Sequence, residues 1–416
     1  MATNTLLTND IILKEGMMHL YNELVVSKLC NRQFEGEFGG GINGGVKAGS
    51  TIRIARPIRG QVRTGATMAP QDITEGREAL TVATQIGADL EFTSADLTLS
   101  VDSFSERILK PQMISLANAI DVAVMTELVN KTPNWVGTPG QTINSYADFT
   151  PAPQRLDELS VPQGRVAILS PADHWGLIGS MSGLYIQSTA KSALERAKMP
   201  PLGNIDMYMS QNVVTHTNGT WSGGSPIAEI DNGTLSTTYA SCKDTWTMTI
   251  HIDGLTANTG TCLVGDVFTI ENVYAVNTIT GATLPWLREF TVRQSVTADG
   301  TGDADLVISP PIITSGPYKT CNAAAVDGAN ITLKGSVNTA YPQNVVFHPD
   351  AVTLAIPPMI KPQGAAWCEQ RSYEGFTLRL VQGYDITNDV PQWRFDMLYG
   401  VVAHQPWLST RVSGAS

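Results

Sequence analysis

Two glycine-containing segments come closest to known catalytic and phosphate-binding motifs. Hydrolases present a serine nucleophile on a Gly-x-Ser-x-Gly turn, and in Gly179-Ser-Met-Ser-Gly183 the central position is Met181. A phosphate loop needs Gly directly before its Lys and Ser or Thr directly after it, but Val46 precedes Lys47 and Ala48 follows it. Neither motif is therefore complete. We instead interpret the glycines of this second segment as a hinge, formed by Gly39, Gly40, Gly41, Gly44 and Gly45.

Metal-binding patterns are equally weak. The six histidines are scattered, and none forms the His-Glu-x-x-His or i, i+4 pair that zinc enzymes use. The segment from Asp299 to Asp305 alternates oxygen-bearing side chains as a calcium loop does, but Ala304 occupies the position of the sharp-turn glycine. An Asp-Gly hairpin turn before the strand Leu306-Val-Ile308 explains the same residues, and calcium remains an alternative. We predict no catalytic residue, no resident metal and no cofactor.

One short basic cluster stands out from an otherwise acidic chain. It comprises four arginines within eleven residues, Arg53, Arg56, Arg59 and Arg63. Nucleic-acid surfaces usually interleave such charges with aromatic side chains, which are missing here, so a contact with an acidic protein neighbour fits better. The tryptophans Trp367, Trp393 and Trp407 would suit a sugar platform, but aromatic residues in strands are more often core residues.

Composition narrows the possible function classes. Only 16% of the 416 residues are charged, whereas 42% are hydrophobic, which excludes a disordered chain and a coiled coil. The net charge of −11 disfavours a dedicated nucleic-acid binder. No run of 18 apolar residues occurs, so no membrane span is expected. Five dispersed cysteines are typical of reduced thiols in a cytosolic product.

Hydrophobic periodicity then predicts the elements that must position these residues. An amphipathic N-terminal helix or arm precedes the glycine hinge, and Thr51-Ile-Arg-Ile-Ala-Arg-Pro57 alternates with the period of a strand. A polar segment containing Glu75 and Arg77 follows, and Ala79 to Ile86 reads as the returning strand. Two strands around a charged segment predict a protruding β-loop that needs a neighbour to be ordered.

The rest of the chain predicts a mixed α/β domain that is interrupted by an all-β block. A helix begins near Ser103 or Ser105 and continues to about Asn130, and its length of about 40 Å indicates a spine. Short strands and helices follow, including a helix capped at Ser170-Pro171 and another from Ser188 to Ala197. From about Val213 to Ser336, alternating Thr, Gly and Val predict a barrel or sandwich of short strands. Apolar strands then return.

This order of elements resembles the major capsid proteins of tailed phages, which have the Hong Kong 97 fold. More narrowly, the chain resembles the coat proteins of the short-tailed Salmonella phages, which carry an inserted six-stranded β-barrel. The resemblance rests on six short segments spread in order over the chain: Thr51-Ile-Arg-Ile-Ala-Arg-Pro57, Leu116-Ala-Asn-Ala-Ile-Asp121, Leu169-Ser-Pro-Ala-Asp173, Gly265-Asp-Val-Phe268, Thr297-Ala-Asp-Gly-Thr301 and Leu398-Tyr-Gly-Val401.

The resemblance implies an α+β fold with an N-terminal arm, an extended β-loop, a spine helix, and peripheral and axial domains, interrupted by an all-β barrel. It divides the chain into an arm (1–45), a β-loop (46–86), a peripheral domain with the spine helix (87–131), an axial α/β domain (132–212), an inserted barrel (213–338) and the return to the axial and peripheral domains (339–416). It also implies that copies of the chain form hexamers and pentamers of an icosahedral shell around double-stranded DNA, bound without sequence specificity.

Further expectations concern partners and contacts. The resemblance implies a scaffolding protein, a portal protein and, in some shells, a decoration protein as partners, with no membrane, and assembly in the bacterial cytoplasm. We expect Arg56, Arg59 and Arg63 to pair with acidic residues of an adjacent subunit, with Glu75 and Arg77 at the base of the same loop. Another phage structural protein of the tail or baseplate, and a carbohydrate-active enzyme with a β-domain, remain as alternatives.

Overall fold

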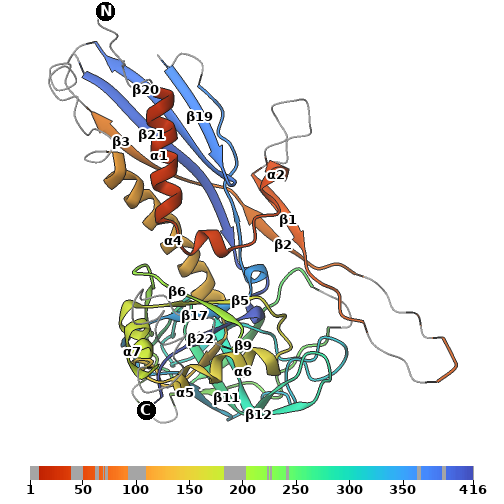
Figure 1. Cartoon of the computed structure of the whole chain (residues 1–416). Coiled ribbons are helices and arrows are strands. Elements are labelled where there is room, and N and C mark those ends of the chain that lie inside the picture. The colour runs from red at the N-terminus through yellow and green to blue at the C-terminus, as the bar shows by residue number, and fades with distance from the viewer. Residues whose placement is uncertain are drawn as a thin grey trace, which may run out of the picture. The chain divides into compact units, whose positions relative to one another are not determined.

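The computed structural model describes residues 9–38, 50–60, 65–68, 70, 74–91, 109–181, 203–222, 224, 227–239, 243–362, 367–386 and 390–415. The chain forms two compact units, each assembled from separate stretches of sequence (Figure 1). Unit 1 comprises residues 1–52, 79–124 and 353–402, and unit 2 comprises residues 53–78, 125–352 and 403–416. The six-part division drawn from the resemblance remains a prediction.

Unit 1 is an antiparallel sheet with a helix across one face. Its strands are β3 (Thr84–Glu91), β18 (Thr353–Ala355), β19 (Trp367–Tyr373), β20 (Phe376–Asp385) and β21 (Val390–Val402). The long strand β21 pairs with β20, β18 and β3. The helix α1 (Asn9–Glu23) lies over β19 and β20 (Figure 1) and buries Leu13, Met17 and Leu20, which recur every three or four residues. The prediction of an amphipathic N-terminal helix is confirmed.

The predicted spine is the helix α4 (Lys110–Lys131), which contributes residues to both units. Within unit 1, its Asp121 carboxylate accepts the backbone N–H groups of Val25, Val26 and Ser27 at 2.9, 3.2 and 2.9 Å. These residues lead into the short helix η1 (Ser27–Leu29), so one buried carboxylate ties the N-terminal segment to the spine. In length and composition α4 resembles a membrane span, but half of the qualifying window is buried within the protein, as in a core helix.

Unit 2 contains a five-stranded mixed sheet in the order β4, β22, β17, β5, β6. The strands are β4 (Asn134–Val136), β5 (Arg165–Leu169), β6 (Ile205–Met209), β17 (Asn344–Phe347) and β22 (Ser409–Val412), accompanied by the helices α5 (Tyr146–Phe149), α6 (Pro151–Glu158) and α7 (Pro171–Met181). Ser170 Oγ accepts the backbone N–H of Asp173, so the predicted capped start of α7 is confirmed. The sheet is buried along its three central strands.

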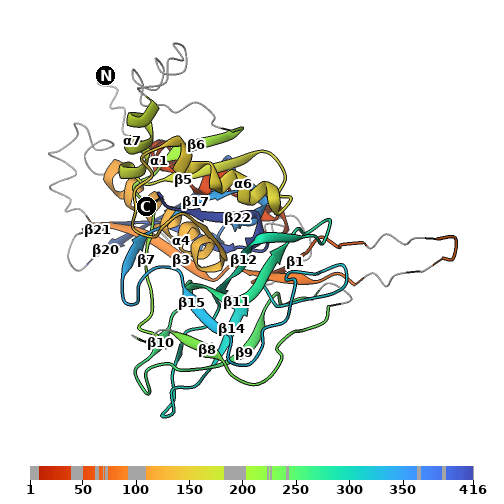
Figure 2. The same cartoon turned by 90° about the horizontal axis from the view of Figure 1, so that it is seen from below.

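A closed six-stranded barrel is inserted between β6 and β17 (Figure 2). Its strands are β8 (Ala228–Ile230), β9 (Met248–Asp253), β11 (Val267–Val276), β12 (Thr283–Val292), β14 (Ala304–Ser309) and β15 (Asn330–Leu333). Phe268, Phe290 and Leu306 are fully buried in its core. The connections into and out of the barrel pair as β7 (Thr215–Thr217) and β16 (Ala340–Pro342). The expected α+β class with an inserted β-barrel is confirmed.

Short elements complete the described chain. They are α2 (Glu35–Phe38), β10 (Thr261–Cys262), β13 (Val296–Thr297), η3 (Pro349–Ala351) and η4 (Pro406–Leu408). The extended loop begins and ends in the paired strands β1 (Thr51–Ala55) and β2 (Arg77–Thr81). The single strand predicted from Ala79 to Ile86 was wrong, because β2 pairs with β1 whereas β3 pairs with β21, and the chain changes partner at Val82 and Ala83. The glycine hinge and the helix predicted from Ser188 to Ala197 lie outside the described residues.

Candidate functional site: the loop base and the barrel junction

The base of the extended loop is fixed to its own chain by one buried arginine. Strand β1 alternates, with Ile52 and Ile54 buried and Arg53 exposed, and Arg56 then turns inward with only 6% of its surface exposed. Its guanidinium forms an ion pair with Glu78 of β2 and donates to the carbonyl of Lys243, 3.3 Å away, in the barrel domain. A buried guanidinium needs such partners to compensate for lost hydration.

This ion pair is part of a longer chain of charges. Glu78 also lies 3.6 Å from Lys131 Nζ, at the C-terminal end of α4, and Lys131 pairs with Glu127 at 2.6 Å. A lysine in the last turn of a helix also complements the helix dipole. The loop base, the end of the spine helix and the barrel domain are therefore connected by one alternating series of positive and negative groups.

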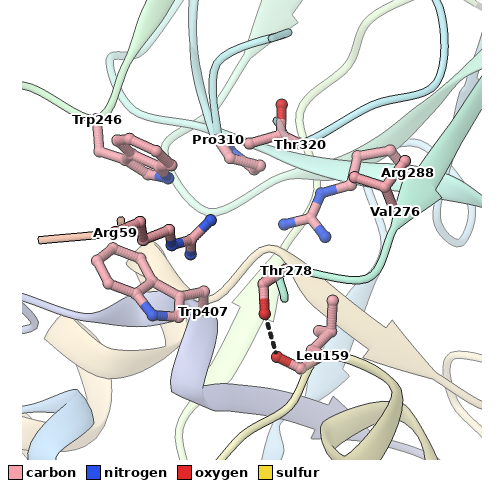
Figure 3. Close-up of a pocket in the computed structure, with 9 residues that line it drawn as sticks. All are labelled: Arg59, Leu159, Trp246, Val276, Thr278, Arg288, Pro310, Thr320 and Trp407. Carbon is pink, nitrogen blue, oxygen red and sulfur yellow. Dashed lines mark hydrogen bonds between the residues drawn. The ribbon is translucent and has the colours of Figure 1, made fainter. Parts of the chain in front are cut away.

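Arg59 enters an aromatic pocket of the barrel domain. Its backbone N–H donates to the hydroxyl of Tyr318 at 3.1 Å, and its guanidinium carbon lies 5.9 Å from the centre of that ring. The pocket is also lined by Trp246 and Trp407, whose ring centres are 5.8 Å apart, and the Arg59 guanidinium points toward that of Arg288 (Figure 3). Trp407 therefore packs with the aromatic cluster of Tyr239, Trp246 and Tyr318 rather than forming a sugar platform.

The other residues predicted for the loop have different environments. Glu75 and Arg77 are exposed, and the backbone N–H of Arg77 donates to Asp244 at 2.8 Å. Arg63 lies outside the described residues. The structure thus brings Arg56, Arg59 and Arg77 to the same barrel domain, but through partners in their own chain. Pairing with a neighbouring subunit remains a prediction, and Glu75 and Arg77 are the members whose exposure best suits it.

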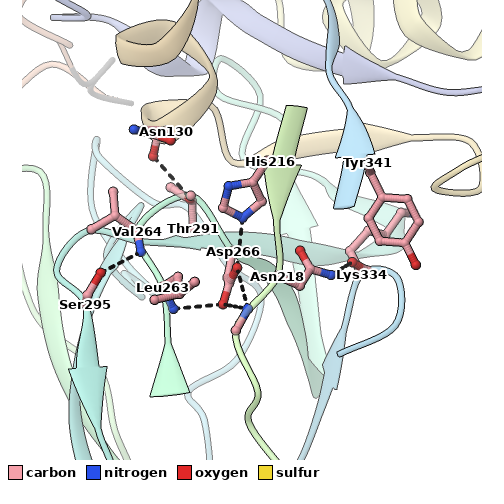
Figure 4. Close-up of polar contacts among 12 residues, drawn as sticks. Asn130, His216, Asn218, Leu263, Val264, Asp266, Thr291, Ser295, Lys334 and Tyr341 are labelled. Atoms are coloured by element: carbon pink, nitrogen blue, oxygen red, sulfur yellow. Dashed lines mark hydrogen bonds and ion pairs between the residues drawn. The ribbon is translucent and has the colours of Figure 1, made fainter. Parts of the chain in front are cut away.

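A fully buried carboxylate organises the junction at the foot of the barrel (Figure 4). Asp266 accepts from His216 Nε2 at 2.8 Å, Gly219 N at 3.1 Å, Trp221 Nε1 at 2.7 Å and Leu263 N at 2.9 Å. The strand leading into the barrel and the turn before β11 are therefore held by one side chain. Asp266 belongs to the Gly265-Asp-Val-Phe268 segment on which the resemblance partly rested, but no role for it was predicted.

Gly265 is required at the same turn for a steric reason. Its φ of +97° is a left-handed conformation that side chains disfavour, and an added Cβ would lie 2.8 Å from Asn130 Oδ1. The close approach matters because Asn130 is near the end of α4, and its carbonyl accepts the Thr291 hydroxyl from β12. The barrel is consequently packed directly against the spine helix.

Arg411 of β22 joins the same elements through backbone carbonyls, and no carboxylate among the described residues pairs with it. Its Nη2 donates to the carbonyls of Val129, Thr132 and Gly265 at 2.6, 3.1 and 2.8 Å, and the side chain is fully buried. Burial lowers the pKa of Arg411 to about 9. The guanidinium thus satisfies carbonyls at the C-terminal end of α4 and links them to the barrel turn.

The acidic segment from Asp299 to Asp305 uses a carboxylate within its own loop. Asp299 Oδ1 accepts backbone N–H groups of Thr301, Gly302 and Asp303 at 2.9–3.0 Å, and these bonds lower the pKa of Asp299 to about 2. The segment is therefore the predicted turn before β14, with its carboxylate engaged by its own loop. No cluster of three metal-binding side chains occurs in the described part of the chain. His174 is buried beside Asp173, which accepts Ile143 N and Asn344 Nδ2.

Several large apolar side chains are exposed on the single chain. The most exposed are Met68 in the loop (78%), Ile279 (79%), Ile360 (78%) and Ile386 (86%). Isolated apolar residues are common on surfaces, but residues at the ends of loops and strands are also suited to contact another molecule.

Comparison with known proteins identifies relatives along the whole chain. The sequence model of the P22 coat protein (gene protein 5) family matches residues 1–410. A major capsid protein of Acyrthosiphon pisum secondary endosymbiont phage 1 is 22% identical over 430 residues, covering 98% of this chain and 97% of that protein.

Similar solved structures include two from phages and one coat protein domain. One from Mycobacterium phage Che8 is 13% identical, with a TM-score of 0.48, and covers 93% of this chain and 90% of that chain. The capsid of Ralstonia phage GP4 is 8% identical, with a TM-score of 0.45, covering 94% and 89%. The CUS-3 coat protein I-domain is 24% identical, with a TM-score of 0.19, and covers 26% of this chain and 96% of that chain.

Proposed function

Because the chain belongs to the P22 coat protein family, and is therefore the major capsid protein of a phage, we propose that its copies build the head through contacts of the extended loop. The copies form hexamers and pentamers that close into an icosahedral shell around double-stranded DNA. We propose no catalytic activity for the chain.

The observation that carries this mechanism is the contrast between the two ends of the loop. The base is fixed by Arg56, Glu78 and the contact of Arg59 with Tyr318. Beyond the base, the described residues 65–68 are all exposed, including Met68. A β-extension with an anchored base and an uncovered outer part can present its outer part to a second subunit without losing its attachment to the first.

Many weak contacts suit a shell that must correct errors during assembly. Each exposed ion pair contributes only about 0–1 kcal/mol, so stability arises from the number of contacts rather than from any one of them. The net charge of −11 is compatible with DNA that is confined by the closed shell and bound without sequence specificity. We further propose a scaffolding protein, a portal protein and a decoration protein as partners, with assembly in the host cytoplasm.

Glu75 and Arg77 provide the sharpest test of the loop contact. The substitution Arg77→Glu reverses an exposed charge while its backbone hydrogen bond to Asp244 is kept. We expect at least a several-fold lower yield of shells, measured by electron microscopy and sedimentation, with an unchanged circular dichroism spectrum of the monomer. By contrast, Arg56→Glu breaks an internal ion pair and should destabilise the monomer itself.

A charge swap is the matched control. The double variant Glu75→Arg and Arg77→Glu keeps the net charge of the chain while reversing the sign at both positions. If specific pairing across subunits matters, the swap should assemble as poorly as Arg77→Glu. Normal shells from both variants would refute the assignment of these residues to the subunit contact.

A further inference from the structure

Arg288 of β12 is a buried cation with no counterion among the residues that the structure describes. Only 4% of its surface is exposed, yet its guanidinium has no hydrogen bond or ion pair with any residue that the structure describes, and its Nε is buried without an acceptor. Uncompensated buried charges are rare because burial removes several kcal/mol of hydration from each ion. The pKa of Arg288 is accordingly lowered to about 10, chiefly by burial.

Neither nearby acidic group neutralises this arginine. Glu289 is adjacent in the strand, so its side chain points to the opposite face, where it accepts Trp135 N at 2.8 Å and pairs with Arg155 at 2.9 Å. Cys321 is buried, and burial raises the pKa of its thiol, which therefore remains uncharged at neutral pH.

The guanidinium instead points into the pocket that also receives Arg59 (Figure 3). Two cations therefore face the same small space, which is walled by Trp246, Trp407 and Pro310. The two pocket hydroxyls already donate elsewhere, Thr278 to the carbonyl of Leu159 and Thr320 to that of Pro311. The pocket thus offers guanidinium N–H donors and positive charge, a combination that recognises an anion.

The size of the space restricts which anion fits. The cavity volume is about 20 Å³, whereas one buried water requires about 10–15 Å³ on the same measure. One or two water-sized atoms therefore fit, which suits a halide ion or the two oxygens of a carboxylate. A phosphate group, with four oxygens, is too large, so the DNA backbone is not the occupant.

We propose that Arg288 and Arg59 bind one small anion, a halide or a carboxylate group, in this pocket. Its charge compensates the Arg288 guanidinium and offsets the repulsion between that group and the guanidinium of Arg59. Because Arg59 follows β1, the bound anion also fixes the base of the extended loop against the barrel domain. The anion is either a free ion such as chloride or a carboxylate group of a second copy of the chain. This site is independent of the proposed loop contact through Glu75 and Arg77.

The test titrates chloride against the thermal stability of the full-length monomer. Ionic strength is held constant with methanesulfonate, whose three oxygens and methyl group are too large for the cavity, and chloride replaces it stepwise. We expect chloride to raise the Tm of the wild type by a few degrees between the lowest and highest concentrations, because it binds only the folded chain. Arg288→Met should abolish this response. Arg293→Met, which removes a half-buried arginine that does not line the pocket, should retain it.

A spectroscopic measurement keeps the test decisive if Arg288→Met does not fold. The ³⁵Cl NMR line of chloride should broaden in the presence of the wild type and sharpen when acetate competes for the site. Arg59→Met provides the second variant and should weaken the broadening. A response in the monomer supports a free ion. If the monomer does not respond to chloride but Arg288→Met lowers the stability of the shells, the anion is a carboxylate from a neighbouring copy. If neither the monomer nor the shells show an effect, the proposal is overturned.

Discussion

Removing the Asp266 carboxylate should destabilise the foot of the barrel strongly. In Asp266→Ala, the N–H groups of Gly219, Trp221 and Leu263 lose their acceptor, as does His216. Each buried donor left unsatisfied costs about 1–3 kcal/mol. Allowing for partial hydration of the space, we expect a loss of roughly 4 kcal/mol in the free energy of unfolding.

The isosteric variant Asp266→Asn separates shape from charge. Oδ2 receives the bonds from Trp221 and Leu263, and an amide oxygen at that position retains them. The new amide nitrogen then faces His216 Nε2, which can accept in its other neutral tautomer. Asp266→Asn should therefore cost only about 1 kcal/mol, the difference between a charge-assisted and a neutral hydrogen bond.

Urea unfolding of the full-length monomer, followed by tryptophan fluorescence and far-ultraviolet circular dichroism, measures both variants. Asp327→Ala serves as a control, because Asp327 is exposed and accepts Asn232 N at the surface, and it should stay within about 0.5 kcal/mol of the wild type. Equal losses for Asp266→Ala and Asp266→Asn, or a loss below about 1 kcal/mol for Asp266→Ala, would refute the role assigned to the carboxylate.

Two further predictions concern other buried polar groups. In Asp121→Ala, the N–H groups of Val25, Val26 and Ser27 lose their acceptor. Their amide hydrogen exchange should therefore accelerate at least about tenfold. Unchanged exchange would show that Asp121 does not hold the N-terminal segment. Burial lowers the pKa of His404 to about 4, so the unfolded chain binds the proton more tightly. Stability should therefore fall as the pH drops from about 6.5 toward 4, by on the order of 3 kcal/mol, and His404→Gln should flatten this dependence in urea titrations at each pH.

Strands with a strong local pattern could be predicted from the sequence. Val166–Leu169 and Val345–Phe347 are continuous apolar runs, and they lie within the buried strands β5 and β17. Strand β1 followed from the alternation of Ile52 and Ile54. The break at Val82 and Ala83 could not be predicted, because both flanking segments favour strands and only the choice of partner separates them.

The environments of the charged residues depended on contacts distant in the sequence. Tyr318 meets Arg59 across 259 positions, and Lys243 meets Arg56 across 187. No local pattern encodes such pairings, so the sequence suggested an external partner for both arginines. Arg288 illustrates the same limit, since an arginine in a strand reveals neither its burial nor its missing counterion until the pocket is assembled.

The strand order of the unit 2 sheet has a consequence for the order of events during synthesis. Strand β22 lies between β4 and β17, although it follows β4 by more than 270 positions. While the ribosome is still translating, β4 has no sheet neighbour on that side, and the sheet cannot close until residue 412 has emerged. The barrel strands, in contrast, all lie between residues 228 and 333 and can pair well before that point. The nascent chain can therefore contain a complete barrel before the surrounding sheet of unit 2 has formed. Arg411, which links the two, is synthesised after all the barrel strands.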